Sequence, residues 1–224
     1  MDFGLSPEHL RTGLIFFLLI FSVLVLRAYA QAWLADRLGD PTPRSDGRVT
    51  LYPPPHVDLL GTVVLPLICI FFFQPRLTQI NFFLAWTKPV PVNPSYFKHP
   101  RRGEVFVQFA GFAMCVAIAF LAAVIGALLL RATGQEKLLE AIIGLISICA
   151  MLMVLDLLPV PPLPGGMLLR YWGIISEETY WMIARWAGLG LLIAFQLQPV
   201  RQFLGLFAAV MAAPFMIVLR LIAG

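Results

Sequence analysis

The stretch Leu26–Trp33, with the sequence LRAYAQAW, lies near the end of the first long apolar run of the chain. That run extends from Thr12 to about Leu34 and is apolar apart from Arg27 and Gln31. Its length suits one crossing of a bilayer, because a spanning helix needs about 20 apolar residues. A charge inside such a helix usually has a partner or faces a wet cavity. The stretch therefore predicts a membrane helix that carries a polar site.

The composition supports a membrane protein. Of 224 residues, 60% are hydrophobic and 12% are charged. In soluble domains about 45–50% of the residues are apolar and about 25% are charged. The net charge of +4 is explained by basic loops on the cytoplasmic side. Because the basic residues are scattered between apolar runs, we expect no nucleic-acid partner. Three cysteines inside apolar runs, without C-x-x-C spacing, predict neither a disulfide framework nor a cysteine metal site.

We predict an all-α polytopic membrane protein with about six transmembrane or membrane-embedded segments in a single domain, residues 1–224. The expected segments are five crossings and one short hairpin, at about 12–34, 104–130, 138–158, 180–197 and 203–222, with the hairpin at 61–86. The hairpin leads into Lys88–Pro94, KPVPVNP, whose three prolines exclude a helix and favour extended backbone. Inside a membrane such backbone must be covered by protein or line a water-filled cleft.

With Leu38–Thr42, LGDPT, which follows it, the first stretch resembles a signature of the site-2 protease family. These proteins are intramembrane zinc metalloproteases. The family has H-E-x-x-H in this helix, where two His bind zinc and the Glu acts as general base on the zinc-bound water. In this chain the first His position is Arg27, the Glu position is Ala28 and the second His position is Gln31.

Further matches follow in the family's order. Residues 51–62 fit L-x-P-x-x-H-I-D-P-x-G-T, residues 86–94 fit W-A-K-P-V-P-V-N-P, and residues 157–163 fit L-L-P-I-P-P-L. The resemblance covers about residues 27–166 and is greatest to the compact bacterial branch without an inserted soluble domain. It implies a family-like core at about 12–170, extra C-terminal spans at about 180–222, and a multi-pass protein of the bacterial inner membrane.

The departures from the family pattern are as ordered as the matches. The third zinc ligand of the family is an Asp whose place here is Pro164, and the Asn of N-L-L-P is Asp156. The Pro and Asn of A-G-P-x-x-N are Phe112 and Cys115. Proline offers no side-chain donor, arginine cannot be deprotonated and a glutamine amide is a poor zinc ligand. We therefore predict that no zinc site of the family type forms, and that the chain has no cofactor and no catalytic residue of that type.

Two alternatives concern the polar residues that remain. His56 and Asp58, two residues apart, share one side of an extended segment and are an alternative pair of metal ligands. Arg27 either extends its head towards water or pairs with Asp156, which the family fold brings to the same site. Our hypothesis is a structural ion pair between Arg27 and Asp156, with Gln31 hydrogen-bonded into the same cluster.

The function that these observations favour is a non-catalytic relative of the proteases, which binds or regulates transmembrane segments of substrates or partner proteases. An extended segment near the site suits strand pairing with an unwound helix. The residues expected to bind a substrate or partner are Trp86, Lys88, Pro89, Val90, Pro91, Val92, Asn93 and Pro94. The alternatives are an active metallopeptidase with unconventional ligands and a structural or transport-linked membrane protein. The lipid bilayer is the other expected partner, and the sequence predicts no oligomeric state.

Overall fold

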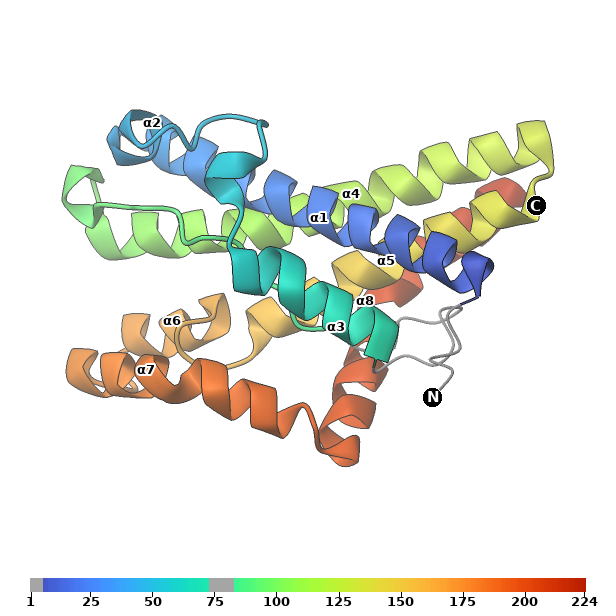
Figure 1. The fold of residues 1–224 in the computed structure, drawn as a ribbon. Helices are drawn as coiled ribbons and strands as arrows, with labels where there is room; N and C mark the ends of the chain where they lie inside the picture. The colour runs from blue at the N-terminus through green and yellow to red at the C-terminus, as the bar shows by residue number, and fades with distance from the viewer. Residues whose placement is uncertain (1–5, 73–82) are drawn as a thin grey trace.

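The computed structural model describes residues 6–72 and 83–224, which form helices joined by turns and irregular segments, with no strand in these ranges (Figure 1). Four of the described helices are long and apolar enough to cross a membrane. They are α1 (Pro7–Arg37), α4 (Pro100–Thr133), α5 (Glu136–Leu157) and α8 (Gln198–Ala223). The prediction of an all-α membrane protein is confirmed.

Shorter elements connect these helices. They are α2 (Thr42–Ser45), the 3₁₀ turns η1 (Pro54–His56) and η3 (Pro94–Tyr96), the π-helical turn η2 (Leu59–Val64), α3 (Leu65–Phe72), α6 (Pro164–Tyr171) and α7 (Glu177–Ala194). The expected hairpin at 61–86 begins with η2 and α3, and its residues 73–82 lie outside the described part. The expected crossing at 180–197 corresponds to α7, which is not among the four long apolar helices.

Local sequence sets where the helices begin and end. Ser6 caps α1, because its Oγ accepts a hydrogen bond from the backbone N–H of His9 at 3.2 Å. Gly134 ends α4 with φ of +64°, a left-handed conformation that glycine adopts without steric cost. Ser176 caps α7 by accepting from the N–H of Thr179.

The core of the molecule lies where α1, α4, α5 and α8 pack together. On α4 the buried residues are small, with Ala119, Ala123 and Ala127 one turn apart. Such a stripe lets neighbouring helices approach closely. At Gly126 an added Cβ would lie 2.6 Å from Cδ1 of Ile142 on α5, so a larger residue there would displace the Ile142 side chain.

The unit formed by α6 and α7 lies to one side of this bundle (Figure 1). α6 contacts α4, α5 and α7, whereas the contacts of α7 are chiefly with α6. The start of α4, α2, the end of α6 and the start of α7 share one end of the molecule (Figure 1). Most of the large side chains of α7 are exposed, Trp186 to 66%, so α7 is attached mainly through its first turn.

Candidate functional site

Arg27 on α1 and Asp156 on α5 form an ion pair inside the helix bundle. Nη2 of Arg27 lies 2.7 Å from Oδ1 of Asp156, and the two side chains are only 13% and 5% exposed. The structure thus brings together the two charges that the sequence analysis expected to pair. Water screens a pair at this depth far less than one on the surface, so the charges are tightly coupled.

Two further polar side chains complete the cluster. Nη1 of Arg27 donates to Sγ of Cys115 on α4 at 3.2 Å. Nε2 of Gln31 donates to the backbone carbonyl of Gln108, also on α4, at 3.2 Å. Gly111 on α4 faces both Arg27 and Gln31. A Cβ added there would lie 3.4 Å from Nη2 of Arg27 and 3.4 Å from Nε2 of Gln31. The cluster therefore joins three helices at one level of the bundle.

One atom of this cluster has no partner. Oδ2 of Asp156 is buried and accepts no hydrogen bond from the described residues. A buried carboxylate oxygen without a donor costs free energy that its partner must offset. Arg27 is therefore essential for holding the Asp156 carboxylate in this position.

Three other positions that the sequence analysis singled out, Ala28, Pro164 and Phe112, carry apolar side chains. Ala28 is fully buried among the core helices. Pro164 is buried at the first position of α6, and Phe112 is partly buried against the core. None of these three side chains contributes a hydrogen-bonding or metal-binding atom.

The proline-rich segment Trp86–Pro94, which we call the strap, crosses the molecule as irregular extended backbone. Its beginning is held by two backbone hydrogen bonds, from Trp86 N–H to the carbonyl of Gly61 at 3.1 Å and from Lys88 N–H to that of His56 at 2.9 Å. Gly61 must be a glycine, because a Cβ there would collide with the Trp86 ring. Hydrogen bonds thus fix the strap at its first residues.

Asp40 holds the other end of the strap, and sequence reasoning missed this role. The residue is fully buried. Its Oδ2 accepts from the backbone N–H of Asn93 at 2.7 Å, and its Oδ1 accepts from that of Thr42 at 3.0 Å. The signal was present, since an Asp before Pro-Thr in a turn commonly bonds the backbone two residues on. The distant partner Asn93 could not be read from the sequence.

His56 and Asp58, the alternative metal pair, are engaged in local structure. Nε2 of the buried His56 lies 2.8 Å from the carbonyl oxygen of Thr50, so this nitrogen is the donor. Oδ1 of Asp58 accepts from Gly61 N–H at 2.7 Å and caps η2. In the described ranges 6–72 and 83–224, no group of three His, Cys, Asp or Glu side chains is placed to hold a metal.

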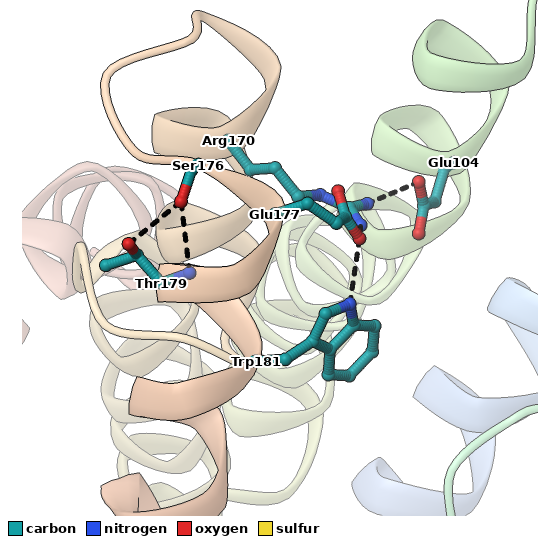
Figure 2. Close-up of polar contacts among 6 residues, drawn as sticks. All are labelled: Glu104, Arg170, Ser176, Glu177, Thr179 and Trp181. Atoms are coloured by element: carbon teal, nitrogen blue, oxygen red, sulfur yellow. Dashed lines mark hydrogen bonds and ion pairs between the residues drawn. The ribbon is translucent and has the colours of Figure 1, made fainter.

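A second polar cluster, also missed by the sequence analysis, links α4 to α6 and α7 (Figure 2). Nη2 of Arg170 lies 2.5 Å from Oε2 of Glu104, and Nη1 lies 2.7 Å from Oε1 of Glu177. The guanidinium also lies over the Tyr180 ring at 4.8 Å. The isolated Arg170 between two helices was a signal of polar surroundings, but neither glutamate could be assigned to it from sequence.

The same cluster shifts the acidity of Glu177. Partial burial raises the pKa of this carboxyl, but hydrogen bonds from Trp181 and Arg170 outweigh the effect. The pKa of Glu177 therefore lies below its ordinary value. Nε1 of Trp181 donates to Oε1 of Glu177 at 2.8 Å, so one carboxylate oxygen is bound from both sides.

Comparison with known proteins finds one similarity. Over 143 residues the chain is 34% identical to the "Putative zinc metalloprotease YwhC" of Bacillus subtilis (strain 168). The matched region covers 61% of this chain and 58% of the length of that relative. This supports the relationship with metalloproteases that the sequence motifs indicated. No family model matches the chain, and no solved structure matches it.

Proposed function

We propose that this chain is a non-hydrolytic relative of the site-2 proteases that binds transmembrane segments of other proteins along the strap. The observation that carries the proposal is the contact among Arg27, Cys115 and Asp156. Each of these residues stands where the family pattern has a different one, and together they form one hydrogen-bonded unit. The similarity to the Bacillus subtilis protein supports the relationship.

The residues present do not fit a zinc ion. A zinc site needs three protein ligands and an open position for water. Arg27 presents only donors and a fixed positive charge, Pro164 has no side-chain donor atom, and the amide nitrogen of Gln31 faces a backbone carbonyl. The one carboxylate of the cluster, Asp156, is already bound by Arg27. We therefore propose no hydrolytic step for this chain.

The strap is an anchored segment with backbone N–H groups that can pair with a bound peptide. Both ends are anchored, at Lys88 by His56 and at Asn93 by Asp40. Between them the backbone N–H groups of Val90 and Val92 form no hydrogen bond within the described part of the chain. Val90 and Val92 alternate with prolines and are partly exposed. Backbone of this kind pairs with an extended segment by strand addition.

A defined probe tests the binding proposal. A photo-crosslinking residue is placed at Val90 and, as a matched control, at Leu128, which is 56% exposed near the other end of α4. Full-length protein in nanodiscs is mixed with a synthetic transmembrane peptide whose helix is interrupted by Gly-Pro, or with an uninterrupted one. We expect crosslinks from Val90 to the interrupted peptide only. Equal crosslinking from both positions would exclude the strap as the binding site.

The absence of a catalytic zinc is tested by elemental analysis. Detergent-purified protein is dialysed against a weak chelator, and we expect much less than one zinc ion per chain. A variant with Arg27→His, Gln31→His and Pro164→Asp restores the family's ligands and shows whether the assay detects zinc on this scaffold. Close to one zinc ion per wild-type chain would contradict the proposal, and replacement of His56 and Asp58 would then locate the ion.

We further propose that the protein resides as a multi-pass protein in the bacterial inner membrane. The four long apolar helices and the motifs of the compact bacterial branch support this location. Cell fractionation followed by immunoblotting checks it.

A further inference from the structure

A two-part hollow lies at the end of the molecule where α4 begins. One part, of about 440 Å³, lies between the start of α4 and the α6–α7 turn. The adjoining part, of about 530 Å³, is more open. Pro100, Arg101 and Tyr171 line both parts. We call the two parts together the α4–α6 hollow.

The rim of the α4–α6 hollow is positively charged. Arg101 and Arg102 are exposed, and neither forms an ion pair with any residue in the described ranges. The acidic residues of the hollow, Glu104 and Glu177, are both bound by Arg170 (Figure 2). Arg170 takes the direct contacts of both carboxylates, and Arg101 acts on Glu177 only through space, with no hydrogen bond or ion pair between them in the described ranges. Two guanidinium groups remain for an external anion.

One wall of the hollow is apolar. Val105, Met167 and Ile175 line the part between α4 and the α6–α7 turn. Phe106, one turn after Arg102, is 59% exposed, and Trp172 after α6 is 64% exposed. Exposed aromatic rings beside a charged rim are typical of the boundary between hydrocarbon and water in membrane proteins. These features are those expected of a surface that meets lipid headgroups.

We propose that the α4–α6 hollow binds the headgroup of an anionic phospholipid, with the phosphate between Arg101 and Arg102. Guanidinium groups bind phosphate oxygens in a bidentate manner, and basic pockets beside membrane helices recognise such headgroups. Tyr171 lines both parts of the hollow, and the acyl chains extend over Phe106. This inference does not depend on the function proposed for the strap.

The apolar wall favours a phospholipid over a free phosphate. A free anion buries no apolar surface against Val105, Met167 or Ile175. The glycerol and acyl portions of a lipid would bury these side chains, which contributes to binding. A peptide would need an acidic segment at the bilayer surface, and its backbone would find few partners along this wall.

Native mass spectrometry of the full-length protein in detergent tests the proposal. The probes are phosphatidylglycerol, which is anionic, and phosphatidylcholine, which has no net charge. We expect the wild-type protein to bind the first phosphatidylglycerol about tenfold more tightly, which corresponds to about 1.4 kcal/mol. Arg101→Gln with Arg102→Gln removes this preference. The matched control Arg37→Gln with Arg44→Gln removes two charges near the same end and keeps it.

Two further measurements distinguish a bound phospholipid from a bound free anion or peptide. Because the attraction is electrostatic, the preference of the wild-type protein falls as ionic strength rises, which requires no variant. As a second measurement, soluble glycerol phosphate is added in excess as a competitor, and we expect phosphatidylglycerol to stay bound. A wild-type protein without preference, or a control variant that loses it equally, would overturn the proposal. Displacement by glycerol phosphate, or a retained peptide in place of the lipid, would overturn it as well.

Discussion

The Arg27 guanidinium has given up most of its hydration, and one oxygen of Asp156 and one sulfur of Cys115 replace it. Breaking a buried pair leaves an uncompensated charge and costs about 3–5 kcal/mol. We expect Arg27→Ala and Asp156→Ala each to lower the free energy of unfolding in detergent by about this amount. The double variant loses much less than the sum. Thermal or SDS-induced unfolding of the four proteins of the cycle measures the coupling.

A coupling energy near zero would contradict this prediction. Because Arg131 is exposed at the far end of α4, Arg131→Ala with Asp156→Ala is the matched cycle, and the two effects should add. The pair need not stabilise more than apolar residues of similar size would. What the cycle tests is whether Arg27 and Asp156 act as one unit.

Asp40 is a second residue that holds a distant part of the chain, because the strap is bound to it at Asn93. Asp40→Ala leaves the backbone N–H groups of Thr42 and Asn93 without their acceptors, which costs about 1–3 kcal/mol. We expect faster hydrogen exchange in the peptide that contains Asn93. In Asp36→Asn, which loses only a surface ion pair with Arg44, exchange of this peptide should be unchanged. Unaltered exchange in Asp40→Ala would show that other contacts hold the strap.

The glycines of α6 and α7 differ in the space around them for the methyl group of an alanine. At Gly165, near the start of α6, a Cβ would lie 2.5 Å from the carbonyl oxygen of Leu158. Backbone cannot move aside as a flexible side chain can, so Gly165→Ala should destabilise by about 1–3 kcal/mol. At Gly188 in α7 such a Cβ meets no described atom within 4 Å beyond the backbone of its own helix and its chain neighbours. Gly188→Ala should therefore stabilise by roughly 0.5–1 kcal/mol through helix propensity.

Both glycine variants are compared with the wild-type protein by thermal unfolding in the same detergent. A loss of stability in Gly188→Ala would mean that α7 packs against a neighbour in solution.

The elements themselves were largely predictable, because long apolar runs and proline breaks define them. The ends of α4 and α5 fall within a few residues of the predicted crossings, and the prolines after Leu157 end α5 as expected. The π-helical turn η2 was not predicted. Asp58 caps it locally, but the close contact of Gly61 with the Trp86 ring depends on tertiary structure. The position of α7 beside the bundle has no local signal in its sequence either.

At the scale of the whole molecule, the α6–α7 unit is attached to the bundle through Arg170. Glu177 has a lowered pKa in the folded protein, so its contribution to stability is present above the ordinary value of about 4.5 and is lost as the pH falls through the lower value. We expect hydrogen exchange in α7 to increase near pH 4, after correction for intrinsic rates. The effect is less than about 1 kcal/mol, because the carboxylate is mostly exposed and water screens the pair.

Glu177→Gln is the control for this pH dependence. It removes the titrating group, so exchange in α7 should no longer change between neutral pH and about pH 4. An unchanged pH dependence in this variant would assign the effect to another group.

The candidate site was predicted in part. Arg27 and Asp156 were identified as partners because two opposite charges stand at positions that the family fold brings together. Asp40 and Arg170 were missed as organising residues, because their partners Asn93 and Glu104 lie 53 and 66 residues away. Such pairings depend on how whole helices pack, and neither periodicity nor local turn chemistry encodes them.

The three cysteines, Cys69, Cys115 and Cys149, are all buried and free. Thiol-directed reagents require an accessible thiolate, so the native chain offers a nearly unreactive background. A spin label can therefore be attached to cysteines introduced at Val90 and Leu189, without first replacing the natural ones. Dipolar electron paramagnetic resonance would then report directly, in a lipid environment, how the separation between strap and α7 changes when a transmembrane peptide is added.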